Sequence, residues 1–362
     1  MSLTHVSLDR AGRWFLESGI QEPSGGVARY YRSEQCRNAR VSTEITGYTV
    51  SALVYLYQRT GRAAYLEAAA RAAGFLLERA WDRELGIFPF EYSENGDAAP
   101  ALAYFFDSGI IARGLLAIWR ATGENRYLDA AVECGRSMLR DFAAGPAIHP
   151  ILSLPRKEPL DYEPRWSRSP GCYQLKSAMA WHDLFAATGE SEFERHYERT
   201  VAASLASHGT FLSEEPDREK VMDRLHAYSY FLEGLLPCAA RPECAAALRE
   251  GLARAGMELR AIAPAFERSD VYAQLLRVRL YASALSVGSL DRAAAEQEAS
   301  QAAGFQFEDT DPRIRDGFWF GRKGGAMLPF VNPVSTAFCA QALDMWRQFE
   351  AGEFRPAIES LI

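Results

Sequence analysis

The 362-residue sequence lacks several features that mark common classes of protein. No apolar run is long enough to cross a bilayer, and the N-terminus has neither the basic start nor the apolar stretch of a signal peptide. The net charge of −7 provides no positive field to attract a nucleic-acid backbone. We therefore expect a cytoplasmic protein that binds neither membranes nor nucleic acids.

Cysteine and histidine are also scarce, with six of each. The cysteines are scattered, without a CxxC pair or a histidine partner at zinc-site spacing, so we expect reduced thiols packed as small hydrophobes. The sequence predicts no metal site and no cofactor. Strand-forming segments are few and confined to loops such as residues 87–92 and 317–321.

What the chain does contain is helix. Residues 42–57 begin with small polar residues and one acid, Glu44, and then become apolar on nearly every face. A helix that is apolar all round must be surrounded by other protein or by lipid, and this one is too short for a bilayer. We predict a buried helix whose polar start faces something other than the core.

The segments around this helix are repeated. TGRAAYLEAA at Thr60 and TGENRYLDAA at Thr122 align without gaps, 62 residues apart, and a weaker copy, TGESEFERHY, begins at Thr188. Self-similarity at a fixed spacing indicates a repeated structural unit. Here the unit is a helical hairpin made of one buried helix, a turn at glycine and one half-exposed helix.

Counting these units predicts the fold. An N-terminal helix over residues 8–19 precedes five hairpins, and a last buried helix follows them. The hairpins pair residues 42–57 with 63–81, 104–119 with 124–142, 171–187 with a helix after 188, 226–240 with 242–262, and 269–286 with 290–303; the last helix is 332–350. About twelve helices predict an all-α (α/α)6 toroid, a single domain over residues 1–362. The N-terminal helix closes it against the last inner helix.

The order of a glycine-aromatic loop, an inner helix such as STEITGY, a TG turn and a YLEAA outer helix resembles the six-hairpin glycosidase superfamily. That group includes unsaturated glucuronyl hydrolases and, more distantly, N-acylglucosamine 2-epimerases. The resemblance covers essentially the whole chain at the level of architecture. It implies a carbohydrate pocket at the end of the barrel where the inner helices begin.

Residues near these helix starts are therefore the candidates for chemistry. Glu44 and Asp107 lie 63 residues apart in neighbouring hairpins, each among apolar residues that would raise a carboxyl pKa. They resemble the paired acids of the unsaturated glucuronyl hydrolases, with Asp107 as the acid and Glu44 as its partner. The alternative role of Glu44 is to stabilise the helix dipole from the first turn, and that of Asp107 is to cap its helix. His226 is a third catalytic candidate, although a lone histidine is more often a hydrogen-bonded core residue.

The predicted substrate-binding residues combine aromatic rings with polar and basic groups. The basic loop near residue 320 could hold a carboxylate through Arg322 and Lys323, or could be a solvated surface loop. The full set is Tyr173, Gln174, Lys176, Tyr230, Trp319, Arg322, Lys323 and Asn332.

The favoured function is a glycoside hydrolase on acidic or unsaturated oligosaccharides or polysaccharide fragments. A sugar epimerase, a polysaccharide lyase and a non-catalytic carbohydrate-binding protein are the alternatives. The resemblance implies that epimerases of this fold use two histidines. Apart from His226, His149 is the one histidine in a plausible loop, which counts against an epimerase. A terpenoid-cyclase toroid would need a clustered acid motif, and EDTD at residues 308–311 is the nearest match. A lanthionine-cyclase ring would need zinc ligands that are absent.

Overall fold

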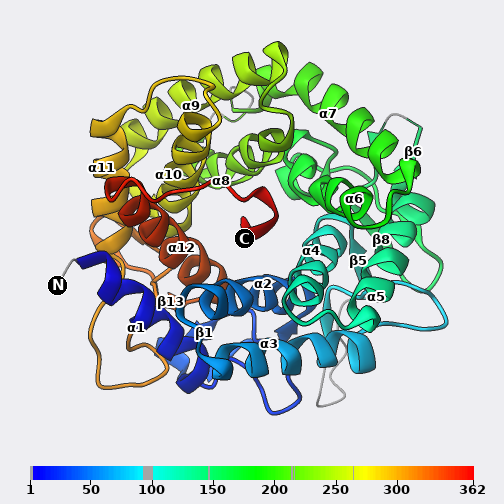
Figure 1. The fold of residues 1–362 in the computed structure, drawn as a ribbon, viewed down its shortest axis with the longest axis horizontal. Coiled ribbons are helices and arrows are strands. Elements are labelled where there is room, and N and C mark those ends of the chain that lie inside the picture. Colours follow the sequence, from blue (N-terminus) through cyan, green and yellow to red (C-terminus); the bar gives the residue numbers. More distant parts are fainter. Residues whose placement is uncertain (1–2, 93–100, 146, 213–214, 216, 264) are drawn as a thin grey trace. The chain divides into compact units, whose positions relative to one another are not determined.

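A computed structural model describes residues 3–92, 101–145, 147–212, 215, 217–263 and 265–362, with side chains from residue 8 onward. The chain divides into two compact units. Unit 1 comprises residues 1–18, 30–37 and 205–362, and unit 2 comprises residues 19–29 and 38–204. Figure 1 traces the helices from blue at the N-terminus to red at the C-terminus.

Unit 2 consists of helical hairpins in which a buried helix alternates with a half-exposed one. Helices α2, α4 and α6 are the buried members, α3 lies beside α2, and α5 lies beside α4 (Figure 1). Helices α3 and α5 each end in a π-helical turn, at 76–80 and 138–142. The helices are α2 Thr43–Thr60, α3 Ala63–Phe75, α4 Phe105–Thr122, α5 Asn125–Ser137, α6 Leu175–Thr188 and α7 Ser191–Phe211, the last of which continues into unit 1.

The three Thr-Gly turns have one atomic design. At the first, the Thr60 hydroxyl donates to the Leu56 carbonyl at 2.7 Å and accepts from the Arg62 amide at 3.3 Å. Gly61 adopts the left-handed conformation, with φ of 70°, and its amide donates to the Tyr57 carbonyl. The same bonds recur at Thr122 and Thr188, where the glycines have φ of 73° and 74°. The predicted repeat is confirmed at all three positions.

Glycines bring the buried helices of unit 2 close together. A Cβ added to Gly114 of α4 would lie 2.5 Å from the Gly47 carbonyl oxygen of α2. A Cβ on Gly109 would lie 2.4 Å from the Ser177 carbonyl oxygen of α6. The backbones therefore meet almost directly, which sets the first turns of α2, α4 and α6 side by side.

Unit 1 continues the alternation. Helix α8 contacts α9 and α10, and α10 contacts α11 and α12. Helix α1 packs on α12, as predicted for the N-terminal helix, and buries Trp14, whose indole N–H donates to the Arg313 carbonyl at 2.9 Å. The helices are α1 Leu3–Glu17, α8 Arg218–Leu235, α9 Pro242–Ile262, α10 Ser269–Ala284, α11 Arg292–Ala303 and α12 Pro333–Glu350.

The strands are two or three residues long and lie in the loops between helices, as the sequence predicts. In unit 2 they are β3 Val41–Ser42, β4 Glu91–Tyr92, β5 Leu102–Tyr104, β6 Ala143–Ala144, β7 Ala147–Ile148, β8 Ile151–Ser153 and β9 Glu158–Pro159. In unit 1 they are β1 Tyr31–Arg32, β10 Phe266–Arg268, β11 Gly321–Lys323, β12 Ala326–Met327 and β13 Phe330–Val331; β2 Arg37–Asn38 spans the division.

One predicted helix start is wrong. Helix α8 begins at Arg218, where Asp217 caps it by accepting from the Glu219 amide at 3.0 Å, and not at His226. Its first turn is charged and exposed, so apolar periodicity does not reveal it. Residues 93–96 of the predicted aromatic loop lie outside the described residues. No described helix is long and apolar enough to cross a membrane. The single-domain organisation stays a prediction.

Candidate active site

The two predicted acids stand in the first turns of adjacent helices of unit 2. Ser42 caps α2 by accepting from the Ile45 amide, and Glu44 follows it as the second residue of the helix. Asp107 is the third residue of α4 and is only 4% exposed. Because glycine contacts hold α2 against α4, the two carboxyls act on each other electrostatically.

Both carboxyls hold their protons more tightly than usual. Burial raises the pKa of Glu44 to about 7, and the Arg29 guanidinium acts in the opposite direction. The pKa of Asp107 lies well above its ordinary value, first because of burial and then because of the neighbouring Glu44 charge. Among the described residues, Asp107 Oδ2 has no hydrogen-bond partner. The site therefore holds a buried acid whose pKa is raised and whose Oδ2 is unengaged among the described residues.

The short strand pair β3–β4 adds a third acid, Glu91, which lies near two arginines, Arg29 and Arg40. Strand β3 pairs with β4, so that Ser42 stands opposite Glu91 at the entrance to α2. Glu91 Oε1 lies 3.5 Å from Nη1 of Arg29, and Arg40 Nη1 lies 3.4 Å from Glu91 Oε2. The Arg29 guanidinium also lies 5.2 Å from the centre of the Phe90 ring. Arg29 thus carries the positive charge that faces the acid pair.

Tyr104 lies near the acid pair and also near the loop that carries Arg165 and Arg168. Burial raises its pKa, with Asp107 as the next contribution, while Arg168, Arg165 and Arg29 lower it. Its ring lies 4.8 Å from that of Phe90. The Tyr104 hydroxyl therefore lies within reach of the charges of Asp107 and three arginines, and its ring packs on Phe90.

The predicted residues in and just before α6 also lie in unit 2 and are buried: Tyr173 and Gln174 belong to a 3-10 turn at 172–174, and Lys176 belongs to α6. Tyr173 donates its hydroxyl hydrogen to the Ser169 carbonyl at 3.0 Å, and its ring lies 5.1 Å from that of Trp166 and 6.3 Å from that of Phe106. Gln174 donates to the Ile148 carbonyl at 3.1 Å and accepts from the Gly171 amide. Lys176 is fully buried in the first turn of α6. Tyr173 and Gln174 thus support the site's loops through hydrogen bonds within the protein.

His226 belongs to a separate cluster in unit 1. Its Nδ1 lies 2.8 Å from Gln274 Oε1 and 3.5 Å from Asp270 Oδ2, and Arg268 binds Asp270 through two nitrogens at 2.6 and 3.0 Å. Because both neighbours of Nδ1 are acceptors, Nδ1 carries the hydrogen and Nε2 is left with the lone pair. Burial, aided by Arg268, lowers the His226 pKa to about 4.

Tyr230 packs its ring against that of His226, with centroids 4.5 Å apart. Burial alone would raise the pKa of Asp270, but Arg268 outweighs it and the pKa lies below its usual value. His226 is therefore a neutral imidazole at neutral pH, oriented by a charged pair. Because α8 begins two turns earlier than predicted, His226 lies within the helix and not at its start.

The remaining predicted binding residues are already engaged in unit 1. Arg322 forms a two-point ion pair with Glu267 and donates to Gln301 Oε1 at 3.1 Å, and Lys323 lies 2.7 Å from Glu219 Oε2. Asn332 caps α12 by accepting from the Ser335 amide at 2.6 Å. Trp319 is half-buried, and its backbone carbonyl accepts from the Ser269 hydroxyl at 2.7 Å.

Sequence reasoning missed Arg29, Glu91 and Tyr104. All three lie in the loops or strands that lead into α2 and α4, and Arg29 belongs to the glycine-bearing loop singled out by the resemblance. Attention to those loops could have found them, although the β3–β4 register that joins Arg29 to Glu91 could not be read from the chain. Within the described residues, no group of three histidine, cysteine or acidic side chains could hold a metal ion.

Several solved structures of carbohydrate-processing enzymes are similar in shape to this chain. Cellobiose 2-epimerase from Spirochaeta thermophila is 13% identical, with a TM-score of 0.71 over 95% of this chain and 98% of that chain. D-mannose isomerase is 10% identical, with a TM-score of 0.69 over 94% and 97%. Unsaturated glucuronyl hydrolase from Streptococcus agalactiae is 9% identical, with a TM-score of 0.67 over 94% and 91%.

At these identities the likeness concerns the fold alone. The chain shares the all-α (α/α)6 fold of these structures, which confirms the fold class predicted from the hairpin repeat. The sequence matches no family model and none of the curated proteins with which it was compared.

Proposed function

We propose that the protein is a carbohydrate-active enzyme, and specifically a glycoside hydrolase that acts on acidic or unsaturated oligosaccharides. The observation that carries this proposal is the Asp107 carboxyl, buried, with Oδ2 unengaged among the described residues and with its pKa raised beside Glu44. A protonated carboxyl held next to a second carboxyl is the arrangement that acid–base catalysis on a sugar needs.

The proposed chemistry divides the work between the two acids. Asp107 donates its proton to the glycosidic oxygen of an ordinary substrate, or to the enol-ether carbon of an unsaturated uronide. Glu44 takes a proton from the attacking water, whose oxygen bonds to the electron-poor carbon. An unsaturated uronide gains one water overall, its ring double bond is consumed, and the resulting hemiketal opens with loss of the neighbouring sugar. Asp107 recovers its proton from solvent.

The charges around the pair favour an acidic substrate. Arg29 faces Glu44 and Asp107, and Arg165 and Arg168 act on the neighbouring Tyr104. Guanidinium groups bind carboxylates through paired hydrogen bonds. The binding role that the sequence predicts for Arg322 and Lys323 stays a proposal. All three cations are paired with an acid, and Arg29 is the better-supported choice because its charge acts on both Glu44 and Asp107.

Unsaturated uronyl disaccharides from several acidic polysaccharides provide the direct test. Their conjugated double bond absorbs ultraviolet light, so hydration lowers the absorbance. We expect Asp107→Asn to reduce turnover by at least ~10²-fold, the usual contribution of a general acid, with little change in stability. Asp129→Asn, an exposed acid of α5, is the matched control and should keep full activity. Near-full activity in Asp107→Asn would overturn the assignment.

The same assay distinguishes the other reactions on this fold. A polysaccharide lyase would create the double bond, so intact polymer would gain absorbance. A non-catalytic binding protein would retain sugar without changing either signal. The cytoplasmic location and the absence of nucleic-acid and membrane partners remain predictions that these assays do not address.

A sugar epimerase is the second candidate, and the His226 cluster favours it. His226 is neutral near pH 7 with a lone pair on Nε2, so it can accept a proton from the carbon next to a sugar carbonyl. Epimerases and an isomerase are also among the structures of similar shape. Incubation with D-mannose and cellobiose in deuterated water tests this candidate: deuterium at C2, lost in His226→Asn, would support it over hydrolysis.

A further inference from the structure

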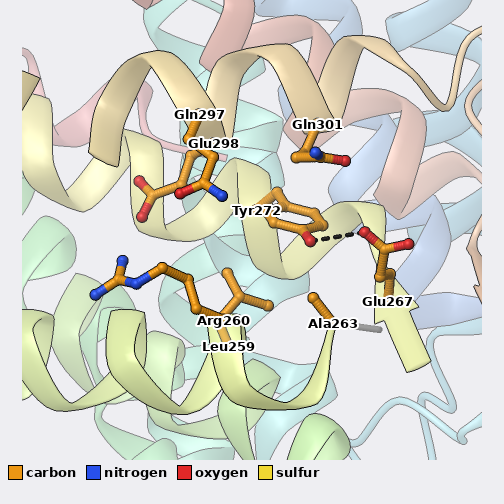
Figure 2. A pocket seen from close by; sticks show the side chains of 8 residues that line it. All are labelled: Leu259, Arg260, Ala263, Glu267, Tyr272, Gln297, Glu298 and Gln301. Carbon is orange, nitrogen blue, oxygen red and sulfur yellow. Dashed lines mark hydrogen bonds between the residues drawn. The ribbon is translucent and has the colours of Figure 1, made fainter. Parts of the chain in front are cut away.

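A recess lies in unit 1, on the side of α10 that faces the half-exposed helices α9 and α11. It encloses about 350 Å³, at the lower end of the size range of small-molecule sites. Figure 2 shows Leu259 of α9 and Ala263, just after that helix, below, Gln297 and Gln301 of α11 above, and Tyr272 of α10 between them. None of these residues belongs to the candidate active site.

One end of the recess is fixed by a hydrogen-bonded chain. The Tyr272 hydroxyl donates to Glu267 Oε1 at 2.8 Å (Figure 2). Arg322 holds both oxygens of Glu267. Arg322 also donates to Gln301 Oε1, which orients that amide so that its NH2 group remains available as a donor. Arg322 thus holds in place two residues that line the recess, Glu267 and Gln301, a role that the sequence did not reveal.

The charges of the recess are largely compensated within the protein. Glu267 is paired with Arg322, and Glu298, 3% exposed, accepts from Arg279 Nε with both oxygens at 2.9 Å. Arg260 adds an exposed guanidinium at the rim. Gln297 and Gln301 contribute uncharged amides, each with donor and acceptor capacity. Apart from Arg260 at the rim, the charged groups that line the recess are paired, so its interior offers a strongly ionic ligand little unpaired charge.

We propose that this recess binds a neutral sugar of one or two rings. A sugar hydroxyl both donates and accepts, which matches the planar amide and carboxylate groups along one side. Its C–H face is apolar and matches Leu259, Ala263 and the Tyr272 ring. The proposal stands on these residues alone and holds whether or not Asp107 and Glu44 catalyse hydrolysis. It gives unit 1 a binding site of its own for an uncharged sugar.

Hydrogen-exchange mass spectrometry on the full chain locates the binding. D-glucose, D-mannose, D-galactose and cellobiose serve as neutral probes, with D-glucuronate as the charged comparison, and affinities come from calorimetric titration. We expect at least one neutral sugar to slow exchange in peptides that cover α9 and α11. The double variant Gln297→Ala/Gln301→Ala should weaken that sugar by on the order of tenfold or more, because two hydrogen-bonding side chains are lost.

Ser300→Ala is the control, because Ser300 is exposed on α11 and does not line the recess. It should leave the affinity unchanged. The proposal is overturned if no neutral probe protects α9 and α11, if D-glucuronate binds there more tightly than every neutral sugar, or if the double variant binds as well as Ser300→Ala. Protection confined to peptides around Glu44 and Asp107 would likewise reject it and leave the proposed hydrolase intact.

Discussion

Glu44 and Asp107 occupy nearly the same place in successive hairpins, but Asp107 lies one residue further into its helix than Glu44 does. The hairpins repeat every 62 residues while the acids lie 63 apart, so Asp107 is the third residue of its helix and Glu44 the second. One residue rotates a side chain by about 100° around a helix axis. Asp107 is the more deeply buried of the two, and the difference in environment assigns it the role of acid.

The raised pKa of Glu44 makes stability depend on pH. Near pH 4 Glu44 is protonated in both states. Between its ordinary value of 4.5 and about 7 the unfolded chain has released the proton while the folded chain keeps it, so stability falls as pH rises. We expect Glu44→Gln to be more stable than wild type at pH 8 by about 1–2 kcal/mol, with little difference at pH 4.5.

Urea unfolding at the two pH values measures this difference. Glu67→Gln, an exposed acid of α3, is the control and should show the same offset from wild type at both. An offset for Glu44→Gln that does not grow with pH would mean that the Glu44 carboxyl is solvated and ionises normally.

Arg29 should affect both substrate choice and the acid pair. Arg29→Gln removes a charge-assisted contact, so we expect binding of acidic substrates to weaken by about 1.5–3 kcal/mol while neutral sugars change little. Because Arg29 lowers the pKa values of Glu44 and Asp107, its loss should also move the alkaline limb of the pH–rate profile upward. Arg29→Lys keeps the charge and should restore the profile more fully than the affinity. An unchanged profile in Arg29→Gln would separate Arg29 from the pair.

At the scale of helices, the glycine contacts determine how closely α2 and α4 approach. Gly114→Ala would place a methyl group 2.5 Å from the Gly47 carbonyl oxygen, and the two backbones must separate to accept it. We expect a loss of about 1–3 kcal/mol in unfolding free energy and a fall in turnover, because the acids move with their helices.

Gly74→Ala is the matched control for that experiment. Gly74 lies in α3, and a Cβ there meets nothing within 4 Å, so alanine should be neutral or stabilise by about 0.5–1 kcal/mol. Chemical denaturation of both variants measures the contrast. Equal stabilities would show that α2 and α4 can separate at little cost.

The elements that the sequence predicts well are those with local causes. The Thr-Gly turns satisfy their own polar groups, and the apolar helices show their burial in their composition. The start of α8 was missed because charged residues form its first turn. The pairing of Arg322 with Glu267 depends on the β10–β11 register, and that of Arg29 with Glu91 on the Ala28–Val41 bridge together with the β3–β4 pair, all of which join distant segments. Such pairings require the three-dimensional structure.

For the whole molecule, we propose that the chain is one domain in the thermodynamic sense. Leu115→Ala in unit 2 and Leu276→Ala in unit 1 each remove a fully buried side chain and should cost about 2–5 kcal/mol. If the units unfold together, each variant lowers the midpoint of one common transition in a calorimetric scan. Two transitions, with each variant moving only one of them, would reveal two independent domains.

The Thr-Gly turns also bear on how such a chain could have arisen. Each turn closes its hydrogen bonds between a helix end and the residues just after it, as at Thr60, Thr122 and Thr188. A connection that needs nothing from its surroundings works wherever it is copied. Tandem gene duplication could therefore lengthen the chain one hairpin at a time, because each copied hairpin brings a working turn with it. On this reading, Glu44 and Asp107 are descendants of neighbouring positions in one ancestral hairpin that have since diverged into partners.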